Sequence, residues 1–556
     1  MDAASARAMT ALGAFFDSYY RLRPVNATFT GVHEHDDRLP DWSPDGLAAA
    51  ADEMRALRTS LARVATPIDS MRDVSARDAA LAVAFLDLQL AELESLHVQR
   101  GNPSLALGEA AFGAISLITR PFAPAADRAR SLARRLEAWP AFLEGARQSI
   151  VRGVPNEWRA KCLHECDGVD RLLGSGIAIW LASESLADAR VTSACERARA
   201  SLHDFRRWLL NDAGVAAPDR YAIGPECFAL LLARGHWCER DPASLSREAE
   251  AALDEALAEL DRRARAAASG GWPEVQARLA DAHPAVGDYL ATYQRLWDEC
   301  RATAEHADLV TWPAYPIRYV PIPVHTRDAA PFLYYLFYRS PAPFDRLPVH
   351  DYVVTPIDGT LPSAEQQRRL RANNWSVIKL NHVVHHGAIG HHVQNYHAYA
   401  GDSEIGRVAA VDCASRIGMF LGGTMAEGWA CYATELMDEA GFLSPDESLA
   451  EQHTRARLLA RAVVDLGLHS GSMTFERAVA LYRDRIGMSP DAARGEACKT
   501  TMFPGTAIMY WLGTDAIHRL RRARERAEGD AFSLRRFHDR LLSFGSIPVP
   551  LLEQIW

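Results

Sequence analysis

Residues 381–397 read NHVVHHGAIGHHVQNYH and form the most informative segment of the chain. This segment holds six of the chain's 20 histidines within sixteen residues. Neutral imidazole is a common protein ligand for zinc and also suits iron, copper and nickel. A single buried histidine is often only a hydrogen-bonded core residue. Six of them in one short apolar segment favour a metal site.

The spacing of these histidines limits which of them can share an ion. On a regular helix His385 and His392 lie on one face but roughly 10 Å apart along the axis, which is awkward for one metal. The usual chelating spacing is i and i+4, and the residue four positions after His385 is an isoleucine, which cannot ligate. Gly387 and Gly390 weaken a helix at this point. A break there would bring either His391 or His392 back toward His385, and the spacing leaves that choice open.

A carboxylate for the same site lies in the segment MAEGWACYATE, residues 425–435. On a helix Glu427, Cys431 and Glu435 share one stripe. Two histidines and one glutamate around an open fourth position are a common catalytic zinc arrangement. The alternative for Glu427 alone is an ordinary acid near a helix start, where its charge is favourable. We therefore predict a metal site that combines Glu427 with the histidines described above.

A third segment, RAVVDLGLH at residues 461–469, contains a polar pair. Asp465 and His469 are i and i+4, so their side chains can touch on a helix. They could support a metal ligand or bind substrate. A buried structural ion pair explains the same spacing equally well.

Composition sets outer limits on function. The 556 residues are 48% hydrophobic and 24% charged, with a net charge of −10, as in a globular protein. A mildly acidic chain is poorly suited to a polyphosphate backbone, so we expect no nucleic-acid partner. No stretch approaches the roughly 18 apolar residues that cross a bilayer, and the start lacks a signal-peptide pattern, so we expect no membrane partner. Nine scattered cysteines predict reduced thiols and a cytoplasmic location.

Hydrophobic periodicity predicts a mostly α-helical protein. Apolar residues on more than one face predict a buried helix over 81–96, and Asp241-Pro242 has the N-cap-then-proline pattern of a helix start. Helices are expected up to about residue 310 and again from residue 364. We divide the chain into a helical portion, 1–310, and a portion that bears the metal site, 311–556, within one continuous structural unit.

The segment near 311–360 is expected to be irregular. Ten of the chain's 29 prolines fall between Pro313 and Pro362, and proline blocks helix interiors. Short runs of β-branched and aromatic residues between these prolines predict strands. The predicted strands are Ile317–Val320, Leu333–Phe337 and Asp351–Thr355.

These segments resemble, in the same order, the motifs of a large bacterial family of α-helical, zincin-like proteins classed as domain of unknown function 885. The family pattern is H-E-x-x-P-G-H-H-x-Q, then E-G-W-A-x-Y-x-E, R-x-x-x-D-x-x-x-H, P-G-Q-A and F-H-D-x-L-L-x-x-G. The counterparts here are HHGAIGHHVQ from His385, EGWACYATE from Glu427, RAVVDLGLH from Arg461, PGTA from Pro504 and FHDRLLSFG from Phe537. The resemblance spans nearly the whole chain and is strongest from 380 to 550. It implies a large helical, zincin-like fold, related to the helical metallopeptidases, with a metal in an interior cleft.

The chain departs from this family pattern at informative places. The family's glutamate after the first histidine, the general base of zincins, is His386 here. The four positions that correspond to metal ligands, His385, His391, His392 and Glu427, are all retained. The resemblance thus implies metal binding more directly than peptidase chemistry. The other departures are Ile389, Lys499, Thr500 and Thr506 in place of the family's proline, arginine, tyrosine and glutamine.

The first functional hypothesis is a soluble metal-dependent hydrolase of an amide or ester bond. It would act on a small-molecule or short peptide-like substrate with one divalent metal, zinc in the first place and iron as the alternative. His386 would act as the base, with Tyr432 or His469 as oxyanion partners.

Two other hypotheses remain open from the sequence. One is a non-hydrolytic metalloenzyme, such as an iron-dependent oxygenase, a lyase or a cyclase in specialised metabolism, which the surplus histidines favour. The other is a catalytically silent metal-binding relative. The sequence indicates no oligomeric state.

Overall fold

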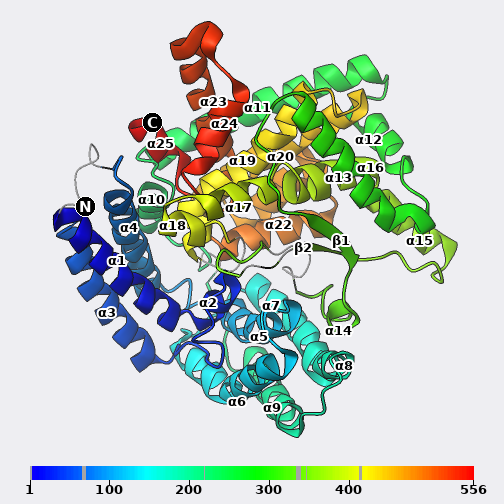
Figure 1. Ribbon diagram of the computed structural model, residues 1–556. Helices are drawn as coiled ribbons and strands as arrows, with labels where there is room; N and C mark the ends of the chain where they lie inside the picture. Colours follow the sequence, from blue (N-terminus) through cyan, green and yellow to red (C-terminus); the bar gives the residue numbers. More distant parts are fainter. Residues whose placement is uncertain are drawn as a thin grey trace.

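The structure, a computed structural model, describes residues 3–64, 71–217, 220–333, 340–345, 347, 349–411 and 416–556. Over these residues it is mostly helical with one small sheet, as the sequence predicts (Figure 1). The helices and strands, in chain order, are α1 (Ala3–Leu22), α2 (Pro24–Thr30), α3 (Pro44–Ala62), α4 (Val74–Glu94), α5 (Pro103–Thr119), α6 (Ala125–Ser149), α7 (Asn156–Arg171), η2 (Leu172–Gly176), α8 (Ile177–Ser183), α9 (Ala189–Asn211), α10 (Pro225–Leu230), η3 (Leu231–Gly235), α11 (Pro242–Ala267), α12 (Trp272–Asp281), η4 (Val286–Asp288), α13 (Tyr289–His306), β1 (Ile317–Pro321), α14 (Val324–Arg327), β2 (His350–Val354), α15 (Ser363–Ala372), α16 (Trp375–Val377), η5 (Ile378–Gly387), α17 (His391–Ala400), α18 (Glu404–Val408), η6 (Gly418–Gly422), α19 (Gly423–Glu439), α20 (Pro445–His469), α21 (Phe475–Ala480), η7 (Leu481–Arg485), α22 (Pro490–Met502), α23 (Met509–Glu528), η8 (Gly529–Ala531), α24 (Leu534–Ser543) and α25 (Val549–Ile555).

Two large hydrophobic cores hold these elements together. The first is built on α5 to α9 and extends to α20, α21 and α22, with Trp139, Trp158 and Trp180 fully buried. The second joins α1 and α4 to α13, the sheet, α17, α19 and the C-terminal helices, around Phe85 and Trp429. Each core therefore draws residues from both portions of the chain, 1–310 and 311–556.

The helices pack against one another in groups, which Figure 1 shows most clearly near the N-terminus. Helices α1, α3 and α4 pack side by side, and α6 lies along α9 in a second group with α5 and α7. In the rest of the molecule α11 packs along α20, and α19 packs along α23. As the sequence predicts, α11 begins at Asp241-Pro242, where Asp241 Oδ2 accepts a hydrogen bond from the backbone N–H of Ser244 at 2.9 Å.

The sheet consists of β1 and β2 in parallel, with Ile317 opposite His350 and Pro321 opposite Val354. Two of the three predicted strands are thus confirmed to within one residue at each end. The third prediction, Leu333–Phe337, falls on residues of which only Leu333 is described, and Leu333 is in no strand. Helix α13 packs against β1, so the irregular segment joins the second core.

Helix α19 packs closely against α23 because small residues meet at their contact. A Cβ atom on Gly428 would meet the backbone of Gly513 on α23, so the two helices can come this close only with glycine at the contact. Residues 423–437 of α19 are all buried. The helix that carries Glu427 is consequently held rigidly between α17, α20 and α23.

Candidate metal centre

The π-helix η5 presents the first histidines of the site. It follows the short helix α16, which is capped by Asn374 through a hydrogen bond from the backbone N–H of Val377 to Asn374 Oδ1 at 3.1 Å. A π-helix has wider i→i+5 turns and is often found at functional sites. In η5 the rings of His385 and His386 lie side by side, with centroids 4.8 Å apart.

Two tryptophans from other helices hold the turn that follows η5. Trp297 on α13 donates a hydrogen bond from Nε1 to the carbonyl oxygen of Gly387 at 2.7 Å. Trp429 on α19 donates from Nε1 to the carbonyl oxygen of Ile389 at 2.8 Å. These backbone oxygens lie in the interior, where an unpaired carbonyl is costly, so the tryptophans stabilise the turn.

The turn breaks the helix where the glycines predict a break. A Cβ atom on Gly390 would overlap the carbonyl oxygen of His385, so the chain can fold back this tightly only with glycine there. Helix α17 then begins at His391. The rings of His385 and His391 are perpendicular, with centroids 4.8 Å apart. The break therefore brings His391 back to His385, one of the two alternatives that the sequence leaves open.

Glu427 joins these histidines from α19. Its Oε2 atom lies 3.4 Å from Nε2 of His385 and 3.6 Å from Nε2 of His391. Ligand nitrogens of His385, His386 and His391 all lie within 4.8 Å of one another. Three elements, η5, α17 and α19, thus bring four of the predicted site residues into one cluster.

The charge of Glu427 is fixed by its neighbours. Burial alone would raise its pKa, but the facing imidazoles of His391 and His385 outweigh burial and hold the pKa of Glu427 well below its usual range. The carboxylate is therefore ionised at neutral pH. An anionic oxygen between two imidazole nitrogens is the donor set of a 2-His-1-Glu metal site.

His386 is oriented by the backbone of its own helix. Its Nδ1 atom donates a hydrogen bond to the carbonyl oxygen of Asn381 at 2.6 Å, because a carbonyl can only accept. This fixes the tautomer in which Nε2 carries the lone pair. Burial, together with the neighbouring imidazoles of His385 and His391, lowers the pKa of His386 well below its usual value, so the ring is neutral at pH 7.

His392 lies outside the cluster although it directly follows His391. Its Nε2 atom is 2.8 Å from the carbonyl oxygen of Tyr315, to which it donates. Its ring stacks on those of Tyr315 and His350, at centroid distances of 5.4 and 5.9 Å. Burial lowers the pKa of His392 to about 4. Its position does not support the predicted role as a ligand, since successive residues of α17 point to different sides of the helix.

Tyr432 is also placed away from the cluster. Its hydroxyl oxygen is 3.0 Å from Nε2 of His538 and accepts a hydrogen bond from Nη1 of Arg521 at 3.1 Å. Tyr432 is five positions beyond Glu427 on α19, so the two side chains leave the helix in different directions. This position does not support the predicted role of Tyr432 as an oxyanion partner.

His469 and Asp465 occupy a separate buried position. Nε2 of His469 donates to the carbonyl oxygen of Thr500 at 2.9 Å, and Nε2 is 3.7 Å from Oδ1 of Asp465. Asp465 accepts hydrogen bonds from the backbone N–H groups of Gly505, at 3.0 Å, and Ile508, at 3.0 Å. Of the two interpretations of this i, i+4 pair, the geometry favours the structural one, since Asp465 anchors the loop after α22.

A cavity of about 590 Å³ opens onto the cluster. His385, His386 and Glu427 form part of its wall. Glu496, which no sequence motif indicates, lines the cavity and forms a bidentate ion pair with Arg461 at 2.7 Å. A glutamate within a helix carries no local signal, so only the packing of α22 against α20 reveals it.

The residues of the cluster fit a zinc ion. Tetrahedral coordination with bonds of about 2.0–2.1 Å places neighbouring donor atoms about 3.3–3.4 Å apart. The Glu427–His385 and Glu427–His391 separations, 3.4 and 3.6 Å, are close to this value. Within the described part of the chain, Glu427 Oε2 is buried and makes no hydrogen bond of ordinary geometry. A buried carboxylate oxygen without a hydrogen bond is available as a metal donor.

The fold and site define a large helical protein with an interior histidine–glutamate cluster. The chain belongs to the family described as bacterial protein of unknown function (DUF885), whose model matches residues 24–555. It is similar to the structure of a "putative lipoprotein of unknown function" from Shewanella oneidensis, with a TM-score of 0.77 and 21% identity over 100% of both chains. It is also similar to a "putative lipoprotein" from Colwellia psychrerythraea, with a TM-score of 0.77 and 17% identity over 99% of this chain and 98% of that one. No curated protein matches the chain.

These comparisons confirm the family and correct the predicted location. Both solved structures carry the description "putative lipoprotein", which contradicts the prediction of a cytoplasmic protein. That prediction relied on unpaired cysteines, but the cysteines among the described residues are buried or half-buried. Buried thiols react little in any compartment, so they do not indicate which compartment holds the protein. Among the described residues, no helix is both long and apolar enough to span a membrane.

Proposed function

We propose that this protein is a metal-dependent hydrolase of amide or ester bonds on a zincin-like helical scaffold. His385, His391 and Glu427 would hold a divalent ion, zinc in the first place. The observation that carries this proposal is the position of Glu427 Oε2, 3.4 and 3.6 Å from two imidazole nitrogens. When bound, the metal would supply Lewis acidity toward a carbonyl oxygen and toward water.

His386 would serve as the general base in place of the usual glutamate. Its Nδ1–H is held by the carbonyl oxygen of Asn381, so Nε2 is the nitrogen that can accept a proton. The ring lines the same cavity as His385 and Glu427, within reach of a substrate bound there. A positioned base typically contributes about 10²–10⁴ in rate.

The cavity suits a small molecule or a short peptide-like substrate. Its volume of about 590 Å³ lies within the usual range for small-molecule sites. Its wall combines apolar residues with charged residues of both signs, among them Arg461, Glu427 and Glu496, which would suit a polar, peptide-like substrate. Glu496 holds Arg461 in place. Burial alone would raise the pKa of Glu496, but the Arg461 guanidinium outweighs burial and lowers this pKa to about 2.

Metal analysis combined with a chelator test examines the proposal. Protein purified without chelator should contain about one zinc ion per chain, as in catalytic zinc sites. It should hydrolyse members of a panel of aminoacyl p-nitroanilides and p-nitrophenyl esters. Treatment with 1,10-phenanthroline should abolish turnover, and added zinc should restore it. Turnover that is indifferent to the chelator would refute the metal-dependent mechanism.

A second candidate is a non-hydrolytic metalloenzyme, and one observation favours it. His386 lies within 4.8 Å of the ligand nitrogens of His385 and His391, so it could serve as a third imidazole ligand. A site with three histidines and a carboxylate would suit iron or another redox metal. Iron with a visible or EPR signal and no hydrolysis would support this candidate. Protein that binds no metal would instead indicate a catalytically silent relative.

A further inference from the structure

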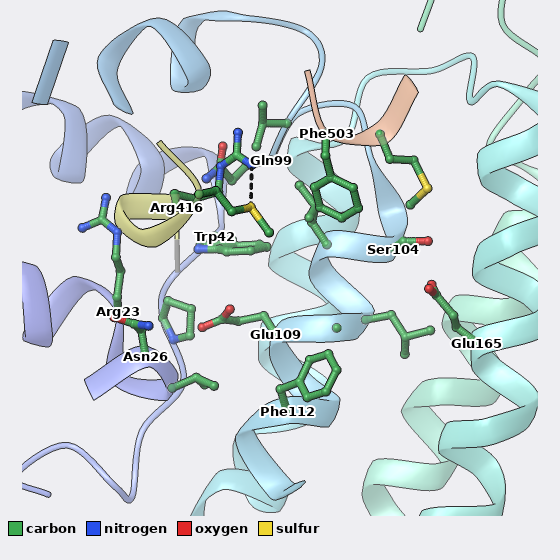
Figure 2. Close-up of a pocket in the computed structure, with 18 of the residues that line it drawn as sticks. Arg23, Asn26, Trp42, Gln99, Ser104, Glu109, Phe112, Glu165, Arg416 and Phe503 are labelled. Carbon is green, nitrogen blue, oxygen red and sulfur yellow. Dashed lines mark hydrogen bonds between the residues drawn. The ribbon is translucent and has the colours of Figure 1, made fainter. Parts of the chain in front are cut away.

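A second large cavity, of about 630 Å³, adjoins the metal cavity (Figure 2). It lies between α5 and the N-terminal segments that carry Arg23, Asn26 and Trp42. No histidine of the cluster lines it. The two cavities share part of their walls, formed by Met419, Glu496, Lys499 and Phe503.

One side of this cavity presents hydrogen-bond donors. Arg23 donates from Nη2 to Oε1 of Gln89 at 2.6 Å and lies over the ring of Tyr19, 5.0 Å from its centroid. Asn26 is only 4% exposed, and its Oδ1 accepts from the hydroxyl of Tyr19 at 2.5 Å. Over the described residues, Arg23 forms no ion pair with a carboxylate, and Asn26 Nδ2 makes no hydrogen bond. Both residues line the cavity, and both keep hydrogen-bond donors that these contacts do not use.

A carboxyl group faces these donors. Glu109 on α5 forms no hydrogen bond or ion pair with any residue that the structure describes. In Figure 2 its side chain lies between Trp42 and Phe112 and is directed toward Arg23 and Asn26. Burial raises the pKa of Glu109 to about 7, although the charges of Arg135 and Arg23 oppose this. An enclosed carboxyl that accepts no hydrogen bond is costly even with guanidinium charges nearby, so a ligand that donates to it, such as an ammonium group, would stabilise it.

The other charged residues of the wall already have partners. Arg416 forms an ion pair with Glu92 and also contacts Sδ of Met419 at 3.4 Å (Figure 2). On the opposite side Lys161 pairs with Glu165 at 2.7 Å. The opposite charges of Arg23 and Glu109 are therefore the ones left for a ligand. Apolar side chains make up most of the remaining wall, among them Leu39, Met54, Leu93, Leu107, Met502 and Phe503.

We propose that this cavity binds a short zwitterionic peptide with large apolar side chains. Its carboxylate would bind Arg23 and Asn26, its ammonium group would bind Glu109, and its side chains would lie against Trp42 and Phe112. Charge-assisted hydrogen bonds at both ends fix the orientation, and the aromatic walls supply apolar contact. The inference does not depend on a bound metal, although a chamber of this kind would suit a neighbouring site that cleaves amide bonds.

The test uses one dipeptide in three charge forms. Leucyl-phenylalanine, its N-acetyl derivative and its C-terminal amide are titrated into the full-length protein by isothermal titration calorimetry. The free dipeptide should bind, and each cap should weaken binding about tenfold, the effect of losing one charged hydrogen bond of about 1.4 kcal/mol.

Two variants test which residue binds each charged end of the dipeptide. Glu109→Gln should weaken binding of the free dipeptide about tenfold. In this variant acetylation should change the affinity very little, because the ammonium group has already lost its partner. Arg23→Met should also weaken binding of the free dipeptide, and in this variant amidation of the C-terminus should change the affinity very little. Glu144→Gln, a charge-matched change at an exposed residue on α6 that pairs with Arg147, should leave all three affinities unchanged. Thermal unfolding checks that each variant is folded.

The titrations are repeated in His391→Ala to separate this cavity from the metal site. Undiminished binding there supports the assignment to the second cavity, whether or not the protein binds metal. Absence of binding by the free dipeptide would overturn the inference, as would binding that is indifferent to both caps. Binding lost in His391→Ala but retained in Glu109→Gln would place the ligand at the histidine cluster and overturn it as well.

Discussion

Trp429 Nε1 donates a hydrogen bond to the carbonyl oxygen of Ile389 at 2.8 Å, and this contact ties the helix of Glu427 to the turn before His391. The two residues lie on separate elements, α19 and the break between η5 and α17. Because Trp429 is fully buried, the bond holds the two sides of the site at a fixed separation. The position of the carboxylate against the histidines thus depends on core packing as well as on the ligands.

Replacement of His391 should remove the metal, whereas replacement of its neighbour should not. His391→Ala deletes a nitrogen that lies 3.6 Å from Glu427 Oε2. We expect zinc affinity to fall by at least about 100-fold, beyond the 10–100-fold typical of residues that only support a ligand. The matched control is His392→Ala, which removes a buried imidazole bonded to the Tyr315 carbonyl. Zinc competition with a chromogenic chelator measures both, and equal losses would contradict the assignment of His391.

Gly390→Ala should damage the site through the backbone. The added Cβ would overlap the carbonyl oxygen of His385 and force the turn open. We expect a loss of about 1–3 kcal/mol in unfolding free energy, typical of overpacking, together with weaker zinc binding. Gly13→Ala in α1 is the control, because nothing lies within 4 Å of the added atom. Denaturant unfolding and zinc titration should show no loss for Gly13→Ala, and an unaffected Gly390→Ala would contradict the close approach.

Two substitutions at His386 distinguish a base from a ligand. His386→Gln removes the proton acceptor, so we expect kcat to fall by about 10²–10⁴ with unchanged metal content. His386→Glu restores the residue typical of zincins and should retain or raise the hydrolysis rate. Rates with a p-nitroanilide substrate and zinc stoichiometry should be measured on the same preparations. Loss of zinc in both variants would show that His386 is a ligand instead.

His538 should make the protein sensitive to acid. Its Nδ1 donates to the carbonyl oxygen of Leu309 at 2.6 Å, and burial lowers its pKa to about 4. In the unfolded chain the pKa is near 6.5, so the unfolded state takes up the proton first as the pH falls. The stabilising contribution of neutral His538 is therefore complete above about pH 6.5 and is lost as the pH falls toward 4, by about 1.4 kcal/mol per unit.

The variant His538→Asn isolates this effect. The difference in unfolding free energy between it and the wild type should shrink between about pH 6.5 and 4.5. Tyr432→Phe removes the hydroxyl next to His538 but leaves the imidazole, so its pH dependence should resemble that of the wild type. Urea unfolding at several pH values measures all three proteins. A constant difference for His538→Asn would show that the ring titrates alike in both states.

Hydrophobic periodicity and the positions of capping residues and prolines predicted the helical class, the start of α11 and two strands, because these features depend on local propensity and on proline. The same reasoning predicted a break at the glycines 387 and 390 and a carboxylate in the EGWA segment. It could not choose between His391 and His392, since they are adjacent and only the exit direction of α17 separates them. It also grouped Tyr432 with the site, although helix geometry sends its side chain toward His538.

The sequence by itself determined which chemical groups the chain carries: clustered imidazoles, a glutamate in the EGWA segment and the glycines that let the backbone turn. The tertiary structure alone decided which of these groups meet. Convergence of His385, His391 and Glu427 requires η5, α17 and α19 to pack at fixed distances, and the charged ends of the second cavity come from α5 and from the start of α2. Distances of a few ångströms between residues far apart in the chain are set by core packing, which local patterns do not encode.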